Sequence, residues 1–385
     1  MKILLINFEY PPLGGGGGVA TAQIAKELAA RHEVHVFTTA FHELPSEEIL
    51  HGVHIHRIQV WGRKELPTAT VVSLITFAPA ALWNGIALMR QYKFDIIHAQ
   101  FVIPSGLPAA LLAMIFRVPF VLTFVGGDVY DPSKAISPHR ITILRALIRW
   151  IASRADARTA ISHDTKTRTI ELHGVQEDIT VVPIGLVHRT QTNTSKIDSG
   201  MPEDSFLCVS IGRLVPRKGY DILLQAWKNI PNAHLVIMGD GPLKAELTNM
   251  ITSFGLADRV LLTGHVTEEQ KQKYLSCADL YVSAAQHEGF GIVFLEAMDA
   301  GLPIVAANDG GQRDFLHHGE HALLVAPYDH RAITRAIDEL MSDSGLRDRM
   351  GKKNKADVQQ YYIENTAKQF EDILIDTKSA YERHH

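Results

Sequence analysis

The chain has 385 residues, of which 46% are apolar, and it carries a formal net charge of −4. This length exceeds that of one typical domain, and the composition excludes a disordered chain and indicates a globular α/β protein. The small net charge gives no indication of a nucleic-acid partner.

The cysteine content and the N-terminus indicate the cellular compartment. The two cysteines, Cys208 and Cys277, both lie in apolar stretches. Two cysteines supply too few ligands for a metal site, so we expect two buried thiols in a reducing compartment. The first residues begin a strand at once and lack the order of a signal peptide. We therefore expect a cytoplasmic protein, with the inner face of the membrane as the alternative location.

Short apolar segments alternate with helical patterns through the first half of the chain. Such alternation, with continuous apolar strands, indicates a parallel sheet that helices cover on both faces. A helix is expected at 18–31, and strands are expected at 2–8, 33–39, 53–60, 94–100, 119–126, 157–162 and 179–185.

Two segments of the first half raise the question of a membrane. Residues 66–89 carry no charge over a length that can span a bilayer, but they include Pro67, Pro79 and Asn84. We therefore expect one or two helices that are buried or rest on a membrane surface. Residues 139–153 form an amphipathic helical pattern, which is explained equally well by a membrane interface and by packing on the chain's own sheet.

The second half repeats the alternation after a polar segment at 187–205, whose composition is typical of a linker. We therefore expect two doubly wound domains joined near residue 190, with a ligand in the cleft between them, because such sheets bind ligands beyond the carboxyl ends of their strands. Helices are expected at 219–229 and 242–254, and strands at 206–214, 234–241, 259–266, 279–285, 302–308 and 322–327.

Five consecutive glycines, Gly14 to Gly18, follow the first strand and open a helix. Backbone N–H groups at a helix N-terminus favour a phosphate, and glycine lets the backbone approach it closely. A flexible loop without a ligand is the simpler alternative. The segment does not fit a dinucleotide site well, because the second strand ends in Thr38 and Thr39 where an acid should bind the ribose.

Three cations gather after the first strand of the second half. Arg213, Arg217 and Lys218 precede the helix that starts at Gly219. Cations at the carboxyl end of a strand, beside a helix N-terminus, suit a dianion such as a diphosphate. A solvated basic loop is the alternative.

The stretch HEGFGIVFLEAMDAGLPIVA, residues 287–306, places Glu288 in a loop and Glu296 inside the helix that follows. We expect this helix to begin near Gly291 and to end at Gly301, before Pro303. A glutamate among apolar residues needs a hydrogen-bond partner, because burying it bare is costly, and a diol such as ribose would supply one. An exposed helix glutamate beside an unrelated loop glutamate is the alternative.

The glutamate pair with seven residues between its members, together with GRLVPRKG and IMGDGP upstream, resembles the retaining nucleotide-sugar glycosyltransferases of group 1, which have the GT-B fold. The resemblance covers essentially the whole chain and is strongest over 206–330. It implies two Rossmann-like domains that face each other across a cleft, an acceptor domain at 1–186 and a nucleotide-sugar domain at 206–360. It also implies a C-terminal helix at 361–385 that crosses back to the first domain.

The resemblance implies a role for each candidate site residue. Glu296 would hold the ribose and Glu288 the donor sugar, while Arg213 and Lys218 would neutralise the leaving diphosphate in place of a metal. The base would lie near Val266. Further donor contacts are expected from Gly16, Gly17, Gly289, Phe290, Gly291, Ile292 and Val293, and acceptor contacts from His98, Gly127 and Asp128, with Asp128 also a candidate for proton handling.

Three positions depart from the family pattern. Val125 stands where the family often has a histidine that contacts the sugar. In this chain that contact must come from another group or be absent. Asp314 stands where glutamate is usual, and Ile184 replaces an asparagine at the expected hinge.

The sequence thus predicts a hexosyltransferase that moves a sugar from a UDP- or GDP-sugar to a hydroxyl of a glycan or lipid-linked acceptor, without a metal or other cofactor. Contact with the membrane surface is a further expectation. The alternatives are an epimerase or phosphorylase of similar fold, a NAD-dependent dehydrogenase, and a non-catalytic sugar-nucleotide-binding protein. The missing acid after the second strand disfavours the dehydrogenase.

Overall fold

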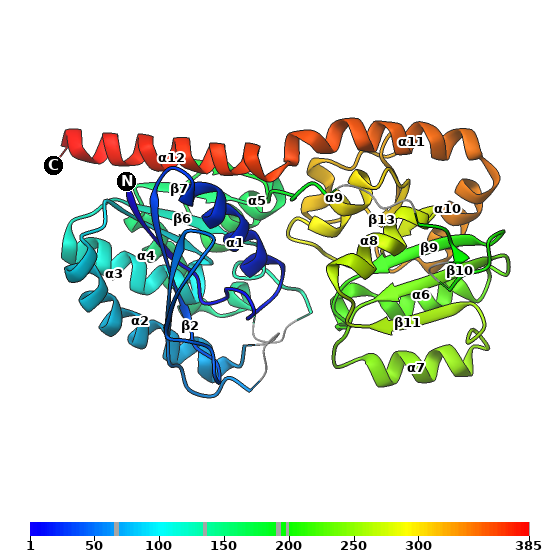
Figure 1. Cartoon of the computed structure of the whole chain (residues 1–385), viewed down its shortest axis with the longest axis horizontal. Helices are drawn as coiled ribbons and strands as arrows, with labels where there is room; N and C mark the ends of the chain where they lie inside the picture. Colours follow the sequence, from blue (N-terminus) through cyan, green and yellow to red (C-terminus); the bar gives the residue numbers. More distant parts are fainter. Residues whose placement is uncertain (65–68, 134–136, 190–193, 198–199, 385) are drawn as a thin grey trace. The chain divides into compact units, whose positions relative to one another are not determined.

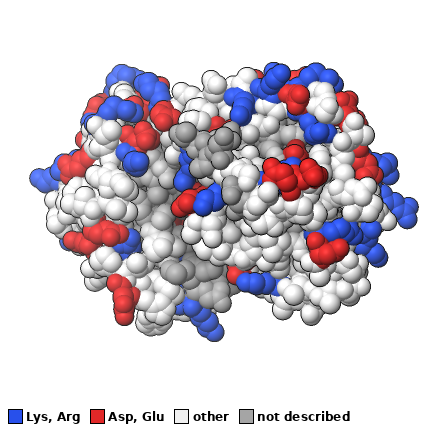
Figure 2. All heavy atoms as spheres, turned by 45° about the vertical axis from the view of Figure 1, so that its right-hand side comes forward, with Lys and Arg blue, Asp and Glu red and all other residues white. Residues whose placement is uncertain are grey.

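A computed structural model describes residues 1–64, 69–133, 137–189, 194–197 and 200–384. Its contacts divide the chain into two compact units, Met1–Val187 with Tyr361–His385, and His188–Gln360. Parts of the expected linker, 190–193 and 198–199, lie outside the described residues, as do residues 66–68 of the uncharged segment. On the face that Figure 2 shows, basic and acidic side chains are intermixed.

The first unit is built on an eight-stranded sheet in the order β3-β4-β2-β1-β5-β6-β7-β8. Every neighbouring pair is parallel except β3 and β4. The chain order reverses between β1 and β5, which is the switch point where such sheets bind ligands. The strands are β1 (Lys2–Ile6), β2 (Glu33–Thr39), β3 (Glu47–Leu50), β4 (Val53–Ile58), β5 (Ile96–Gln100), β6 (Phe120–Phe124), β7 (Ala157–Ala160) and β8 (Ile179–Val181).

Helices cover both faces of this sheet (Figure 1). The side chains of α1 (Gly16–Ala29) and α12 (Ile363–His384) join one apolar core, and those of α2 (Val71–Tyr92), α3 (Leu107–Phe116) and α4 (Thr142–Arg154) join the other. A fifth helix, α5 (His163–His173), follows β7. The expected strands of the first half are therefore confirmed, while β3 is an element that the sequence did not predict.

The C-terminal helix belongs to the first unit. Phe370 and Leu374 of α12 are buried in its core, Glu371 bonds to Arg31 and His32 at 2.8 Å, and Lys378 pairs with Asp95 at 3.2 Å. The described part of the expected linker instead packs on the second unit, where Lys196 bonds to Asp279 at 2.7 Å and His188 to Asp299 at 3.0 Å.

The second unit has a six-stranded parallel sheet in the order β11-β10-β9-β12-β13-β14, which reverses between β9 and β12. The strands are β9 (Phe206–Ile211), β10 (Ala233–Met238), β11 (Val260–Gly264), β12 (Leu280–Val282), β13 (Ile304–Ala307) and β14 (Ala322–Val325). The helices are α6 (Tyr220–Trp227), α7 (Lys244–Ser253), α8 (Glu268–Cys277), α9 (Ile292–Asp299), α10 (His330–Ser342) and α11 (Ser344–Asp357).

The two segments that raised the membrane question have different environments. Ile148, Ile151 and Ala152 of α4 are buried, so the apolar side of this amphipathic helix packs on its own sheet. Residues 71–92 form one helix, α2, with Pro79 inside it. Among the described residues, α2 is the one helix whose length and composition would allow it to cross a membrane. Its inner side packs into the core through Phe77, Ala81 and Met89.

Candidate active site

The candidate site of the second unit lies where β9 and β12 end, at the switch point of the sheet. The chain leaves β9, makes the 3₁₀ turn η4 (Pro216–Lys218), and enters α6 through Gly219, whose φ is 63°. A Cβ at Gly219 would collide with the carbonyl oxygen of Ala284, which follows β12. Glycine is therefore required here, because it both adopts the left-handed conformation and lets the two strand ends approach.

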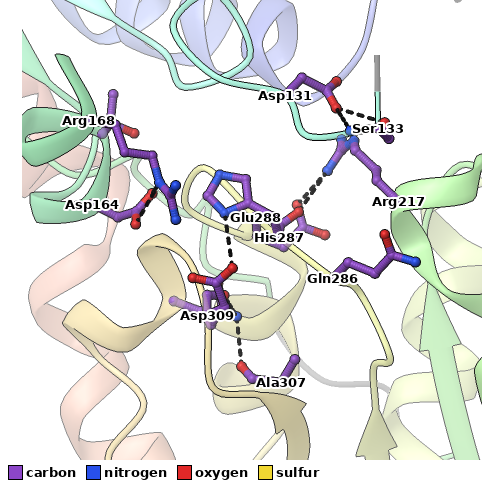
Figure 3. A network of polar contacts seen from close by, with 12 residues as sticks. Asp131, Ser133, Asp164, Arg168, Arg217, Gln286, His287, Glu288, Ala307 and Asp309 are labelled. Atoms are coloured by element: carbon purple, nitrogen blue, oxygen red, sulfur yellow. Dashed lines mark hydrogen bonds and ion pairs between the residues drawn. The ribbon is translucent and has the colours of Figure 1, made fainter. Parts of the chain in front are cut away.

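Lys218 and Arg217 converge on the carboxylate of Glu288. The ammonium of Lys218 bonds to Oε1, and the guanidinium of Arg217 donates to Oε2 at 3.1 Å and to the carbonyl of His287 at 3.3 Å. Figure 3 shows the side chains of Arg217 and Glu288 pointing toward each other. Both members of the Lys218–Glu288 pair are buried, with 11% and 7% of their side chains exposed.

The charges around Glu288 determine its ionisation. Burial alone would raise the pKa of Glu288, but the positive charges of Lys218 and Arg217 outweigh burial and lower this pKa to about 2. Burial lowers the pKa of Lys218, and the neighbouring carboxylate opposes that shift. Glu288 is therefore a carboxylate at neutral pH, which can accept hydrogen bonds from hydroxyl groups but carries no proton to donate.

The loop that carries Glu288 is held from the β13 side. The amide of Gly311 donates to the carbonyl of Glu288 at 2.7 Å, and Gly310, with φ 99°, lies too close to the Glu288 backbone for any side chain. His287 points toward Asp309, with 3.9 Å between Nδ1 and the carboxylate (Figure 3). The position of Glu288 is therefore set by backbone contacts as well as by its two cations.

The helix after this loop begins where the sequence predicts. Gly291, with φ 90°, is the N-cap of α9, Ile292 is its first residue, and Gly301 follows its end with φ 74°. The Glu288 side chain lies against Gly291, since a Cβ there would come within 3.7 Å of the Glu288 Cβ. Phe290 is buried against Phe315, with ring centroids 5.0 Å apart. The first turn of α9 thus starts beside the Cβ of Glu288.

Glu296 finds its hydrogen-bond partner within the protein. The ammonium of Lys271 on α8 bonds to its Oε1 and also to Glu268 at 3.0 Å. Burial raises the pKa of Glu296, and the charge of Lys271 opposes that shift. The sequence reasoning missed Lys271, because a lysine in the polar run of α8 is typical of a solvated face. The buried neighbours of Glu296 were the one signal that it needed a cation.

Two predicted donor residues lie at the margins of this cluster. Arg213 is exposed. Val266 is half-buried beyond the end of β11. Arg217, which the sequence placed among the cations expected to suit a diphosphate, is the second cation on Glu288.

In the glycine run of the first unit, some glycines are closely packed and others have open space around them. A Cβ at Gly17 would come within 2.5 Å of the Phe101 ring, and one at Gly18 within 3.0 Å of the Glu9 carbonyl. Gly16 has no atom within 4 Å of its Cβ position. The amide of Gly15, the N-cap of α1, donates to the carboxylate of Glu9 at 3.2 Å. Close packing thus explains Gly17 and Gly18, while Gly16 stays open to a ligand.

The three predicted acceptor residues differ in exposure. Asp128 is buried and accepts the amides of Val102 at 2.6 Å and Val125 at 3.0 Å, so its carboxylate holds the turn it belongs to. Burial raises the pKa of Asp128 to about 6, although these backbone bonds oppose the shift. His98 has no exposed surface, and its Nε2 lies 2.7 Å from Thr123 Oγ1. Gly127 is exposed.

Among the described residues of the second unit, one group is of metal-ligand type. His317, Glu320 and His321 bring three ligand atoms within 4.8 Å of one another at the turn before β14. His321 already bonds to Asp357 at 2.8 Å. This group includes none of the predicted site residues.

Comparisons with known proteins match both units of the chain. Residues 15–185 match the model of the glycosyl transferase 4-like domain, and residues 191–357 match that of glycosyl transferases group 1. The N-acetyl-alpha-D-glucosaminyl L-malate synthase of Bacillus anthracis is 27% identical over 98% of this chain and 97% of its own. A GDP-mannose-dependent alpha-(1-6)-phosphatidylinositol monomannoside mannosyltransferase of Mycolicibacterium smegmatis is 25% identical over 91% of both chains.

Solved structures share the fold of this chain. Sucrose-phosphate synthase from Thermosynechococcus elongatus has a TM-score of 0.85 at 23% identity, covering 99% of this chain and 100% of its own. HepE from Anabaena, crystallised with UDP, has a TM-score of 0.79 at 21% identity, covering 98% and 100%. With its two doubly wound units of the GT-B type and both domain models matched in order, the chain belongs to the group 1 glycosyltransferase family.

Proposed function

We propose that this glycosyltransferase moves a sugar from a nucleotide diphosphate sugar, a UDP- or GDP-sugar, to a hydroxyl of a glycan or lipid-linked acceptor. The transfer retains the anomeric configuration and needs no metal or other cofactor. The observation that carries the proposal is the buried Lys218–Glu288 pair, with Arg217 beside it, at the start of α9. Cations and helix amides at one strand end suit a diphosphate, and a carboxylate among them suits sugar hydroxyls.

The diphosphate gains negative charge as it leaves, and this is where the cations act. Lys218 and Arg213 would bind its oxygens, and the amides of Ile292 and Val293 would donate to them from the first turn of α9. Such preorganised donors stabilise a transition state most where its charge develops. They would do here what a divalent metal does in other reactions with a phosphate leaving group.

The two glutamates would orient the donor. Glu288, as a carboxylate with a pKa of about 2, accepts bonds from sugar hydroxyls and has no proton to give to the leaving group. Lys271 bonds to Oε1 of Glu296, and Oε2 is the oxygen that we assign to the ribose hydroxyls. Gly289, Phe290 and Gly291 would add backbone contacts, and Val266 would contact the base.

The proton of the acceptor hydroxyl would pass to the leaving diphosphate. In this step the bond from the anomeric carbon to the diphosphate oxygen breaks, the bond to the acceptor oxygen forms on the same face, and a phosphate oxygen takes the acceptor's proton. No protein base is then needed. Of the three candidate acceptor residues, Gly127 is exposed, while Asp128 and His98 are buried and would act by shaping the surface around it.

The relatives support a nucleotide-sugar donor and differ in its base. The name of the Mycolicibacterium enzyme specifies GDP-mannose, whereas HepE was crystallised with UDP and with UDP-glucose. The names of several relatives refer to cell-envelope polymers, such as teichuronic acid and lipopolysaccharide core. We therefore propose an envelope glycan or lipid acceptor at the cytoplasmic side of the membrane.

A thermal-shift panel tests the donor first. UDP, GDP, ADP, NAD and the corresponding sugar conjugates are added to the full chain in the presence of EDTA. A ligand at 100 times its Kd stabilises the folded state by about 2.7 kcal/mol, which is enough to detect. One nucleotide diphosphate and its sugar should raise the melting temperature, and a shift with NAD alone would contradict the proposal.

Product analysis then tests the reaction. With the donor identified, transfer is followed in EDTA, and the anomeric configuration of the product is read by NMR. An α-linked donor should give an α-linked product at an undiminished rate. An inverted product, or activity that returns only with added Mg²⁺ or Mn²⁺, would overturn the retaining or the metal-independent part of the proposal.

A further inference from the structure

The outer side of α2 carries a continuous row of exposed apolar side chains. Residues four apart are neighbours on a helix, and each such step turns by about 40°, so the row runs obliquely along the exposed side of α2, about 24 Å long over 16 residues. Ile75 is 68% exposed and Trp83 is 79% exposed. The row consists of Val71, Ile75, Pro79, Trp83 and Ala87, all of which are exposed.

Two neighbouring segments extend this stripe. The amide of Trp61 donates to Thr76 of α2 at 3.2 Å, which ties a second exposed tryptophan, 78% accessible, to the same helix. Helix α3 lies beside α2 (Figure 1), and a Cβ at Gly85 of α2 would come within 2.6 Å of Leu112. We call the resulting patch the α2 surface: the α2 row with Trp61, and with Met114 and Ile115 of α3, both exposed.

Basic residues occur at one end of the α2 surface. Arg90 is exposed in the last turn of α2, and Lys93 and Arg117 are the exposed residues that end α2 and α3. Asp95 is the sole acidic residue in the sequence between 66 and 127. Its carboxylate is already bonded to the Lys2 amide at 2.7 Å and to Lys378 at 3.2 Å. The segment between residues 66 and 127 thus carries three basic residues and one acidic residue.

We infer that the α2 surface docks on an anionic lipid bilayer, with α2 lying in the interface and not crossing it. Tryptophan prefers the headgroup level, apolar side chains reach the acyl boundary, and each nearby basic residue adds attraction to anionic lipid. A span is excluded in the folded unit, because Phe77, Ala81 and Met89 of the same helix are buried in the core.

The alternative surfaces fit less well. The apolar side of α4 is occupied by the core of its own unit, so the second amphipathic segment has no comparable stripe to offer. A second copy of the α2 surface would bring further cations and no carboxylate to pair with them, so self-association lacks charge complementarity. The inference rests on this surface alone and does not depend on the proposed donor or reaction.

Vesicle sedimentation tests the inference. The full chain is mixed with vesicles of phosphatidylcholine alone and with vesicles that also contain phosphatidylglycerol, at low and high salt. We expect binding to the anionic vesicles that weakens with salt. The double variant Ile75→Gln with Trp83→Gln should bind at least about tenfold more weakly. Arg90→Gln and Lys93→Gln should each weaken binding about fivefold.

Ile143→Gln on α4 is the matched control, because Ile143 is 77% exposed on a neighbouring helix of the same unit. It should bind as the unchanged chain does. All variants should keep the melting temperature of the unchanged chain, since each altered side chain is exposed. Loss of vesicle binding in Ile143→Gln would place the lipid-binding surface on α4 and contradict the inference. Full vesicle binding by the double variant would also overturn it. A dimer in ultracentrifugation that Trp83→Gln abolishes would identify a second copy as the occupant instead.

Discussion

Lys218 and Glu288 lie 70 residues apart in the sequence and form a buried ion pair. The lysine ends the turn that follows β9, and the glutamate lies in the loop that follows β12. These two strands are neighbours because the sheet reverses its order between them. The pair therefore joins the two loops that meet at the switch point, and it positions a cation and an anion where a sugar diphosphate would bind.

Replacing Lys218 by alanine should lower kcat by at least about a hundredfold, because a donor aimed at developing charge is removed. Removing one partner of a buried ion pair also destabilises the fold, by roughly 3–5 kcal/mol, so the melting temperature must be measured on the same sample. Lys244→Ala is the matched control, since this lysine of the same unit pairs with Asp240 at the exposed surface. A Lys218→Ala enzyme with full activity would refute the role of the cation.

Glu296→Gln should weaken nucleotide binding by roughly ten- to a hundredfold, because a charged hydrogen bond to ribose becomes a neutral one and Lys271 loses one of its two carboxylate partners. The comparison is Glu269→Gln, an exposed glutamate on α8 whose partner Lys273 is also exposed. Titration calorimetry with the nucleotide diphosphate measures both. Equal affinity in Glu296→Gln and the unchanged chain would show that Glu296 serves only to pair with Lys271.

Two neighbouring glycines separate packing from ligand contact. Gly17→Ala should destabilise the first unit by roughly 1–3 kcal/mol, because its Cβ would meet the Phe101 ring at 2.5 Å. Gly16→Ala should leave stability unchanged or raise it by up to about 1 kcal/mol, because its Cβ meets nothing within 4 Å and alanine favours a helix.

Donor binding by the Gly16→Ala variant then tests the predicted phosphate contact. If the backbone of Gly16 approaches the donor, the added methyl group should weaken donor affinity at an unchanged melting temperature. Calorimetry and thermal melting of the same preparation give both quantities. An unchanged donor affinity would show that Gly16 is part of the loop but does not contact the donor.

His98 should make the first unit less stable in acid. Burial lowers the pKa of His98 to about 3, below the value near 6.5 of an unfolded histidine. As the pH falls, the imidazole of His98 is therefore protonated in the unfolded chain before it is protonated in the folded chain. The full contribution of His98 to the free energy of unfolding is present above about pH 6.5. It is lost progressively as the pH falls toward 3, by about 5 kcal/mol in full.

Denaturant unfolding at a series of pH values measures this contribution. In His98→Gln, whose amide can still bond to Thr123, the free energy of unfolding should fall less steeply below pH 6.5. The exposed His265, changed in the same way, is the control. An unaltered pH dependence of unfolding in His98→Gln would contradict the effect of burial. The same variant tests the predicted acceptor contact, because undiminished sugar transfer would show that His98 has only a packing role.

Particular elements show what could be read from the sequence. The strand after the glycine run and the strand before Glu288 were predictable because continuous apolar segments between helices have few alternatives to a buried parallel strand. The start of α9 at Ile292 was predictable from Gly291, and its end from Gly301. Strand β3, with the sequence EEIL, was missed because it is short and largely exposed at the edge of the sheet, where its glutamates pair with His56 and Arg57 of β4.

The partners of the charged residues were beyond sequence reasoning. The sequence by itself determined the fold class, because local periodicity encodes it. Motif spacing determined the family, and it placed Glu288 in a loop and Glu296 in the helix that follows. Only the tertiary structure decided that Arg217 and Lys218 share one carboxylate, that Lys271 bonds to Glu296, and that α4 hides its apolar side while α2 exposes one. The reason is physical. Hydrophobic periodicity shows that a helix has an apolar face, but it does not show which segment covers that face. The segment that covers it, and the distant charge that pairs with a buried carboxylate, are brought there only by the fold.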